Sequence, residues 1–267
     1  MAYETILYDV DDEHVATVTL NRPDKLNSFN MAMRRDFRQL WREVQDDDAV
    51  HAVVLRAAGD RAFSTGIDAT ERADLMARGV HVGAPPNPFV AEDPGITLAP
   101  KQNECWKPII CAVHGMAAGG AFYWINESDI VIAADDATFF DPHVTYGMTS
   151  SLEPVGLRWR IPLGEVLRWA LMGLDERMSA ERAREIGLVS EVVPRESLWD
   201  RAHEVAAIVA AKPSVATQGT VKAIWRSLDL TRSANIDLGM MYVQLGNPVG
   251  ETQVDRSSAP RPKPQIR

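Results

Sequence analysis

The sequence predicts an α/β fold in which buried strands alternate with amphipathic helices. Short, nearly continuous apolar runs at residues 50–57, 109–113 and 130–133 are typical of strands buried on both faces. Ahead of the first run, residues 37–44 carry apolar side chains at positions i, i+3, i+4 and i+7, the spacing of a half-buried helix. Strands and helices in this alternation favour β-β-α repeats or parallel crossovers.

The flanking elements follow from turn and cap signals. Near the N-terminus, the acidic turn at residues 11–13 separates two β-rich runs, 5–9 and 15–20, and this pattern predicts a hairpin. In the second half of the chain, Ser179 is the expected N-cap of a helix over residues 180–186.

The C-terminal part of the chain is expected to be helical. One helix ends before Lys212 and carries a stripe at Leu198, Ala202, Val205 and Val209. A second helix is expected from about Ser214 through Leu228, with its buried side at Val221, Ile224 and Trp225. Residues 79–100 predict a long loop or lid, and residues 257–267 a disordered tail, because both are rich in proline and poor in apolar periodicity.

The composition restricts the class of protein. The 267 residues include 28 Lys and Arg against 37 Asp and Glu, a formal net charge of −9 at pH 7. An acidic chain is poorly suited to nucleic acid or to an anionic membrane surface, since both select cationic proteins. We find no signal peptide and no run of the roughly 20 apolar residues that a membrane span needs.

The cysteines and histidines give no metal-binding pattern. Cys105 and Cys111 match neither a CxxC site nor a disulfide framework, so we expect free thiols in a reducing cytoplasm. The histidines outside the motifs described below lie in polar or turn contexts without ligand spacing, at positions 14, 51, 81 and 203. We therefore expect no metal site.

Two glycine-containing segments carry the chemistry. Residues 61–68 (RAFSTGID) and 112–121 (AVHGMAAGGA) each lie between an expected strand and an expected helix. Small residues at such a turn expose backbone N–H groups, and two of these groups converging on one carbonyl oxygen form an oxyanion hole. The competing structural explanation is tight strand–helix packing without a ligand. The second segment lacks the GxGxxG spacing of a dinucleotide site.

Taken together, four motifs resemble the enoyl-CoA hydratase/isomerase (crotonase) superfamily. AFSTGID is similar to its FxxGxD element, and AVHGMAAGGA with SDIVIA is similar to its AVNGxAxGGG…CDIxxA stretch. NRPDKLNSF and MSAERAREIGLVSEVVP resemble its early and late motifs, in the family's order. The resemblance implies a spiral of β-β-α units over residues 1–200, a helical trimerisation region over 201–254 and a loose tail over 255–267.

The resemblance also implies a ligand and an assembly. Family members bind an acyl-CoA thioester, whose coenzyme A is part of the substrate, and need no separate cofactor. Carried over by position, the N–H groups of Ile67 and Gly120 would stabilise the enolate. Lys25 and Leu26 would lie along the coenzyme A. The loop near its adenine end would contain Phe63, Ser64, Gly66 and Asp68. A homotrimer or a dimer of trimers is expected, and Thr70 stands where the family often has a lysine for a phosphate.

The expected acid–base residues differ from those of the hydratases. Both hydratase glutamates are replaced, one by Tyr123 and the other by His143. A tyrosine with a pKa of about 10 is a poor base near neutrality, whereas a histidine at about 6.5 suits the role. Glu153 lies where isomerases and some hydrolases of the superfamily place a carboxylate. A His143–Glu153 pair able to activate water resembles oxocamphor hydrolase-like C–C hydrolases.

Structural explanations compete for each of these residues. His143 is alternatively a turn histidine after Pro142, Glu153 a helix-capping acid, and Tyr123 a wall of the pocket. The expected function is acyl-CoA processing through an enolate, with weak hydration of straight-chain enoyl-CoA. The alternatives are hydrolysis of a C–C bond in a β-diketone or β-keto thioester, and a non-catalytic acyl-CoA binder. The negative charge argues against RNA binding.

Overall fold

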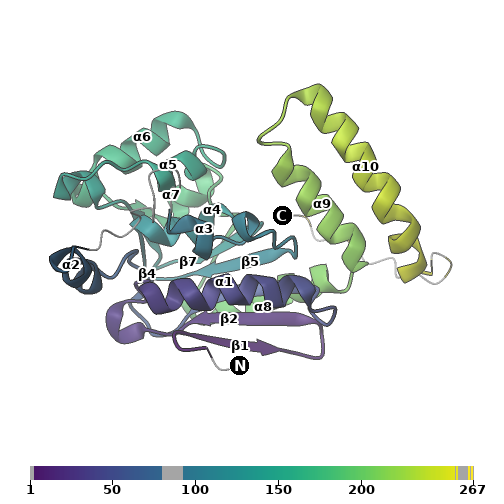
Figure 1. Cartoon of the computed structure of the whole chain (residues 1–267), viewed down its shortest axis with the longest axis horizontal. Helices are drawn as coiled ribbons and strands as arrows, with labels where there is room; N and C mark the ends of the chain where they lie inside the picture. The colour runs from purple at the N-terminus through teal and green to yellow at the C-terminus, as the bar shows by residue number, and fades with distance from the viewer. Residues whose placement is uncertain (1–2, 80–92, 256, 258–263, 265, 267) are drawn as a thin grey trace.

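The chain forms two β-sheets joined by a repeating strand–strand–helix path (Figure 1). The computed structural model describes residues 3–79, 93–255, 257, 264 and 266. The six-stranded sheet contains, in spatial order, β1 (Ile6–Val10), β2 (Val15–Leu20), β3 (Ala52–Ala57), β5 (Ile109–Val113), β7 (Ile130–Ala134) and β10 (Glu191–Val193). The four-stranded sheet contains β4 (Ala62–Ser64), β6 (Met116–Ala118), β8 (Thr138–Phe140) and β9 (Met178–Ser179).

Helical segments follow the strand pairs. The helices are α1 (Met31–Asp46), α2 (Ala69–Ala77), α3 (Gly95–Leu98), α4 (Phe122–Asn126), α5 (Leu152–Leu157), α6 (Leu163–Leu171), α7 (Ala180–Glu185), α8 (Leu198–Ala210), α9 (Ser214–Arg226) and α10 (Arg232–Gly250). The short 3-10 turns are η1 (Pro23–Lys25), η2 (Lys101–Asn103), η3 (Gly119–Ala121), η4 (His143–Tyr146), η5 (Gly173–Asp175), η6 (Arg195–Ser197) and η7 (Glu251–Gln253). No helix in the described part of the chain has both the length and the apolar character needed to cross a membrane.

The predicted α/β spiral is confirmed. β3, β5 and β7 are parallel neighbours in the six-stranded sheet, and β4, β6 and β8 are parallel neighbours in the other. Each successive strand pair therefore spans both sheets before the chain turns into a helical segment. The N-terminal hairpin is also confirmed, because β1 and β2 pair antiparallel.

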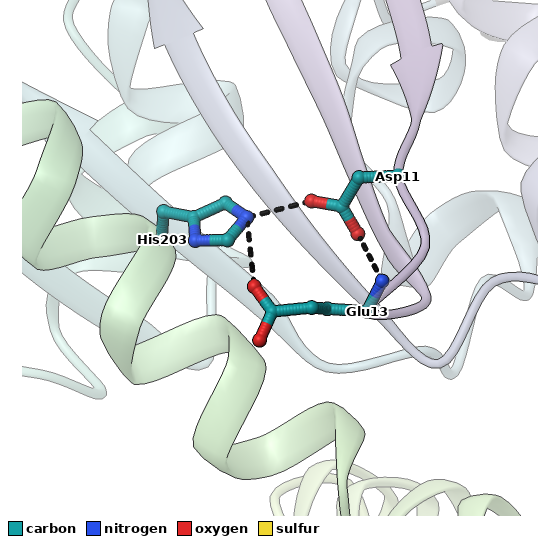
Figure 2. Close-up of side chains that lie close together, drawn as sticks. All are labelled: Asp11, Glu13 and His203. Atoms are coloured by element: carbon teal, nitrogen blue, oxygen red, sulfur yellow. Dashed lines mark hydrogen bonds and ion pairs between the residues drawn. The ribbon is translucent and has the colours of Figure 1, made fainter.

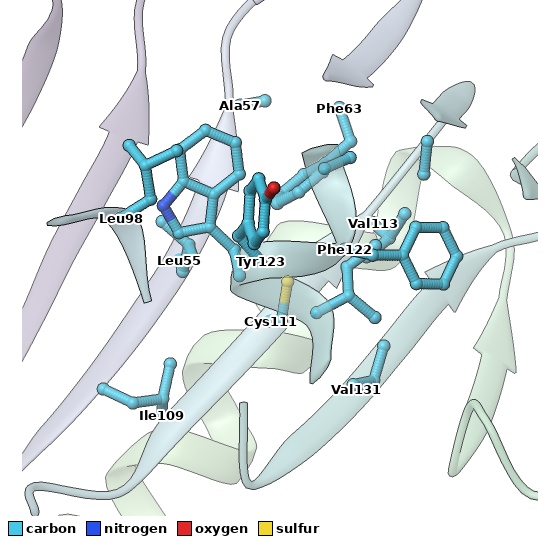
Figure 3. Close-up of a cluster of buried hydrophobic side chains, with 14 of the residues drawn as sticks. Leu55, Ala57, Phe63, Leu98, Ile109, Cys111, Val113, Phe122, Tyr123 and Val131 are labelled. Atoms are coloured by element: carbon cyan, nitrogen blue, oxygen red, sulfur yellow. The ribbon is translucent and has the colours of Figure 1, made fainter. Parts of the chain in front are cut away.

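The main core lies between the sheets and the helices that cover them (Figure 3). The stripe predicted over residues 37–44 forms the inner face of α1, with Phe37, Leu40, Trp41 and Val44 fully buried. Asn30 caps this helix by accepting a hydrogen bond from the N–H of Met33.

A second apolar cluster lies between the six-stranded sheet and α8. The fully buried side of α8 is Leu198, Ala202, Ala206 and Ala210, whereas the predicted Val205 and Val209 are half-buried beside it. The buried side of α8 is therefore rotated relative to the predicted stripe. Alanines allow the helix to approach the sheet more closely than valines do. Part of the expected C-terminal helical region thus covers the core.

The predicted buried side of α9 is wrong at Ile224. This side chain is 62% exposed, and α9 has no fully buried residue. Figure 1 shows α9 and α10 as a helix pair that extends away from the sheets. An apolar stripe predicts an apolar helix face, but it does not predict that another segment of the same chain packs against that face.

Two expected irregular segments fall largely outside the described residues. Residues 80–92 of the expected loop and most of the tail from residue 257 lie there. The end of the loop differs from the prediction, because residues 95–98 form α3.

Asn27 fastens the turn after β2 to the strand pair that leads into the glycine segment at residue 66. Its side chain is fully buried, donates to Ala58 O (2.9 Å) and Ala62 O (3.0 Å), and accepts from the N–H of Arg22 (2.9 Å). The residue has φ of 51°, in the left-handed region that asparagine tolerates better than most residues.

Replacing Asn27 by alanine is expected to lower the free energy of unfolding by about 2–3 kcal/mol, because buried carbonyls lose their donor and alanine is strained there. Urea denaturation measures the change. The matched control is Asn21→Ala at an exposed position, expected to stay within about 0.5 kcal/mol of the parent. Equal effects of the two substitutions would contradict this account.

Candidate active site

The first half of the site is the turn between β4 and α2. The N–H of Phe29 donates to Gly66 O, and the N–H of Asp68 donates to Phe29 O, each at 2.8 Å. In extended chain, successive N–H groups point to opposite sides. The N–H of Ile67 therefore points away from Phe29.

The second half is η3, which follows β6. Gly120 is the second residue of this short turn, and the first N–H groups of a helical turn lack acceptors within it. A methyl group added to Gly66 would lie 2.8 Å from Gly120 N, and one added to Gly120 would lie 3.4 Å from Gly66 Cα. The two backbone segments are thus in direct contact. Gly66 also has φ of 81°, which side chains disfavour.

His143 is held by a buried carboxylate directly after β8. Its Nδ1–H donates to Asp141 Oδ1 at 2.5 Å, and the Asp141 side chain is fully buried and also accepts from the Ser150 hydroxyl. Because Nδ1 faces the Asp141 carboxylate, the imidazole proton is assigned to Nδ1, and Nε2 is left facing Glu153 Oε1 at 4.0 Å. The hydrogen bond that the imidazole donates to Asp141 raises the pKa of His143.

Glu153 and Tyr123 complete the cluster. Glu153 lies in the first turn of α5 with its side chain 6% exposed, and this burial raises the pKa of its carboxyl group. Tyr123 lies on α4, and burial together with the neighbouring Glu153 and Asp93 carboxylates raises the pKa of its hydroxyl. A phenol in this setting is a proton donor or a wall and not a base.

The acid–base cluster lies against η3. A methyl group on Gly119 would be 3.5 Å from His143 Cε1, and one on Gly120 would be 3.2 Å from Tyr123 Cε2. The structure therefore brings together the five residues that the sequence indicated as catalytic, which are Ile67, Gly120, Tyr123, His143 and Glu153. The paired amides could hold an oxyanion, while the carboxyl and imidazole move a proton beside it.

The residues expected along the coenzyme A divide into exposed and buried ones. Lys25 is exposed, and Leu26 is half-buried at the end of η1 with φ of 52°. Phe63 is fully buried in the core. The buried Ser64 hydroxyl donates to Asn27 O and accepts from the N–H of Gly66. Phe63 and Ser64 therefore support the turn between β4 and α2.

Asp68 is likewise committed within the protein. Its carboxylate forms an ion pair with Arg22 at 2.8 Å and caps α2 by accepting from the N–H groups of Thr70 and Glu71. The Arg22 hydrogen bond and the cap together hold the pKa of Asp68 below its ordinary value, against the effect of burial. Asp68 therefore fixes the position of α2 relative to the turn.

Sequence reasoning missed the two residues that orient His143. Asp141 stands two positions before His143, and Ser150 stands seven positions after it. The available signal was an acid before Pro142 in the same turn. The spacing of the residues in the sequence does not indicate that the Asp141 side chain turns inward. The turn after β8 places this side chain beside the imidazole of His143.

A separate polar cluster joins the hairpin turn to α8 (Figure 2). His203 Nε2 lies 2.6 Å from Asp11 Oδ2 and 3.9 Å from Glu13 Oε2, although His203 showed no ligand spacing in the sequence. One potential ligand atom from each residue lies within 4.8 Å of the others. An ion pair between the imidazole and Asp11 accounts for the short contact, and the expected lack of a metal site stays a prediction.

The fold and the apposed glycine segments define a crotonase-type α/β protein. The family model described as enoyl-CoA hydratase/isomerase matches residues 11–246. The chain belongs to this family, whose members are hydratases and isomerases of acyl-CoA thioesters.

Named relatives support the same assignment. The chain is 32% identical over 245 residues to 1,2-epoxyphenylacetyl-CoA isomerase of Escherichia coli, covering 91% of this chain and 90% of that protein. It is 31% identical over 236 residues to (E)-benzylidenesuccinyl-CoA hydratase of Thauera aromatica, covering 87% and 85%. Among solved structures, an enoyl-CoA hydratase/isomerase from Mycobacterium paratuberculosis is 38% identical, with a TM-score of 0.82 and coverage of 91% and 90%.

The raised pKa of His143 is expected to fall toward the value of free imidazole in Asp141→Asn, because the amide no longer favours the charged ring. Titration of the imidazole resonances by NMR measures it. Because the folded-state pKa exceeds the unfolded one, the pairing stabilises the fold at pH values below the unfolded pKa. This stabilisation is lost as the pH rises through the folded pKa.

The control for this titration is Asp136→Asn, which removes a carboxylate from a partly exposed ion pair with Arg195. It is expected to leave the pKa of His143 unchanged. An unchanged His143 titration in Asp141→Asn would contradict the assigned partner.

Proposed function

We propose that the protein processes an acyl-CoA thioester through an enolate. The oxygen of that enolate is held by the N–H groups of Ile67 and Gly120. The observation that carries the proposal is the alignment of Asp141, His143 and Glu153 beside the contact between the two glycine segments. The named relatives support a thioester substrate, because both are named for reactions of CoA thioesters.

The proton chemistry follows from the two sides of His143. Nδ1–H is engaged by Asp141, so Nε2 is the atom that accepts or returns a proton. Burial raises the pKa of Glu153, and this shift lets its carboxyl group carry a proton close to Nε2 of His143. In a β,γ-unsaturated thioester, removal of a proton at Cα and return of one at Cγ moves the double bond to the α,β position, and this isomerisation needs no pair of glutamates.

A second candidate is hydrolysis of a C–C bond in a β-diketone or β-keto thioester. It is favoured by the imidazole held between two carboxyl groups, an arrangement that can activate water. His143 would take a proton from water while the hydroxide adds to the β-carbonyl carbon. The bond from that carbon to Cα then breaks, and Cα of the released enolate takes up a proton.

The proposed route predicts that His143→Ala lowers the rate of Cα proton exchange by about 100-fold or more, since it removes the base. Exchange is measured by NMR in deuterium oxide with a panel of acyl-CoA thioesters and β-keto thioesters, and mass spectrometry detects cleavage products. Binding of the thioester is expected to persist, because the amides and the coenzyme A surface remain.

The matched control is His203→Ala, which removes an ion-paired histidine on α8. It is expected to leave exchange unchanged. Cleavage products from the parent would favour the hydrolase, and binding without exchange would identify a non-catalytic binder. Hydration of crotonyl-CoA at a rate typical of the family would contradict the expected weak hydration of straight-chain enoyl-CoA.

Assembly as a homotrimer or a dimer of trimers is part of the proposal. Large apolar side chains stand exposed on α6 and α10, including Leu167, Leu171, Met241 and Leu245. Leu171 is 67% and Leu245 70% exposed, and exposed large apolar side chains gathered on a helix favour contact sites between proteins. The expected cytoplasmic location stays a prediction.

The double substitution Met241→Glu with Leu245→Glu is expected to weaken the assembly, because it places charge on the apolar face of α10. Analytical ultracentrifugation measures the mass relative to the 29.5 kDa subunit. Leu7→Glu, at an exposed position on β1, is the control that should retain the parent's mass. A monomeric parent protein would contradict the proposed assembly.

A further inference from the structure

A large chamber opens beside the acid–base cluster. Its volume is about 650 Å³, and Tyr123, Ser151 and Leu152 line it where it meets the chain around Glu153. An engineered apolar cavity of about 150 Å³ already accommodates benzene. The chamber therefore has room for a ring together with the chain that joins it to a thioester.

Aromatic side chains from distant parts of the sequence line this chamber. They come from the segment after η2, from α4, from the end of α5 and from α9, and they are Trp106, Phe122, Tyr123, Trp159 and Trp225. Aromatic rings favour offset and edge-to-face contacts with other rings, beyond the burial of their area. A lining of this kind distinguishes a ring from a flexible alkyl chain.

The polar ends of two of these indoles are already occupied. Trp225 Nε1–H donates to Asp129 Oδ1 at 2.6 Å, and Trp106 Nε1–H donates to Glu104 Oε2 at 3.2 Å. These two side chains therefore offer a ligand only the carbon surface of their rings.

The charges around the chamber disfavour an anionic acyl group. Two cations line it, Lys101 paired with Asp129 and Arg226 paired with Glu104. Four carboxylates belong to the same lining, which are Asp93, Glu104, Glu127 and Asp229. A carboxylate at the far end of the acyl group would therefore be repelled by the negative charges of this lining.

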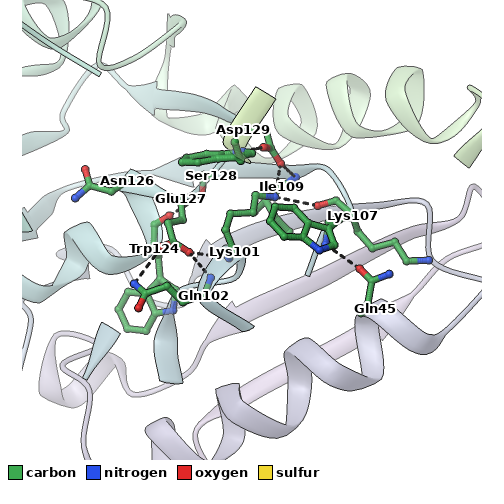
Figure 4. Close-up of polar contacts among 12 residues, drawn as sticks. Gln45, Lys101, Gln102, Lys107, Ile109, Trp124, Asn126, Glu127, Ser128 and Asp129 are labelled. Atoms are coloured by element: carbon green, nitrogen blue, oxygen red, sulfur yellow. Dashed lines mark hydrogen bonds and ion pairs between the residues drawn. The ribbon is translucent and has the colours of Figure 1, made fainter. Parts of the chain in front are cut away.

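The side chain of Asp129 joins α9, which forms one side of the chamber, to the core through several hydrogen bonds (Figure 4). Asp129 accepts from Lys101 Nζ at 2.9 Å and from the N–H of Ile109 at 2.7 Å, in addition to the Trp225 indole. The side chain of Lys101 is 5% exposed, so this ion pair is shielded from water. The chamber thus has a defined width before a ligand arrives.

Building on the proposed function, we propose that the acyl group of the substrate is uncharged and carries an aromatic ring, which the tryptophans of this chamber bind. The thioester carbonyl lies at Ile67 and Gly120, and the acyl group runs past the Tyr123 ring into the chamber. Substrates with a straight alkyl chain or a distal carboxylate are the poorer ligands.

The test compares three CoA thioesters by isothermal titration calorimetry. Phenylacetyl-CoA and octanoyl-CoA have the same number of acyl carbons, and adipoyl-CoA supplies a distal carboxylate. Phenylacetyl-CoA is expected to bind about tenfold more tightly than octanoyl-CoA, a difference of about 1.4 kcal/mol, and adipoyl-CoA to bind most weakly. Equal or tighter binding of octanoyl-CoA or adipoyl-CoA would overturn the inference.

A variant locates the preference in the chamber. Trp159 is 51% exposed at the end of α5, so Trp159→Leu removes a ring with little effect on the core. It is expected to abolish most of the preference for phenylacetyl-CoA and to leave octanoyl-CoA binding nearly unchanged. Trp199→Leu, at a half-buried tryptophan on α8 that lies over Arg56, is the matched control and should retain the preference. An equal loss for both thioesters in Trp159→Leu would overturn the assignment to the chamber.

The two proposals fail in different ways. A preference for phenylacetyl-CoA without Cα proton exchange in any thioester supports the chamber and contradicts the proposed function. Exchange at equal rates in phenylacetyl-CoA and octanoyl-CoA, with equal affinities, supports the proposed function and overturns the chamber assignment.

Discussion

The contact between Gly66 and Gly120 is the constraint on which the rest of the site depends. The two residues follow β4 and β6, which are parallel neighbours in the four-stranded sheet, so the register of that sheet sets their separation. A side chain at Gly66 would press against Gly120 N, 2.8 Å away, and one at Gly120 would press against the Phe29 ring, 2.5 Å away. The two glycine segments therefore meet because successive turns of the spiral end level with one another, and the hydrogen bonds of Phe29 leave the N–H of Ile67 pointing away from Phe29.

Burial of Asp141 is the matching constraint on the proton chemistry. A carboxylate without exposure is costly unless it is paired and hydrogen-bonded. Asp141 meets this requirement with the imidazole Nδ1–H and the Ser150 hydroxyl. The same bonds that make its burial tolerable fix the tautomer of His143. The contacts that stabilise the fold around Asp141 are thus the same contacts that the proposed chemistry requires.

The sequence predicted those features that depend on local pattern. The apolar run at residues 109–113 became β5 with the same bounds, and the glycine motifs located both halves of the site. It did not predict contacts that depend on how elements meet. Asp141 turns inward only because the chain bends after β8, and the chamber combines residues from position 93 to position 229. Ile224 shows the converse, since a helical stripe predicts an apolar face and the side chain is nevertheless 62% exposed.

The two carboxyl groups near His143 are not equivalent, and this inequality gives the site a direction. Asp141 bonds Nδ1–H of the imidazole at 2.5 Å and raises the pKa of the ring. Glu153 lies 4.0 Å from Nε2, too far for a hydrogen bond in the unliganded protein, and its own pKa is raised by burial. Under the proposed function, protons move on the Nε2 side of the imidazole, beside the Glu153 carboxyl group, while Nδ1 stays bonded to Asp141. Pairs of titratable groups held in different environments in this way divide the acid and base roles between them.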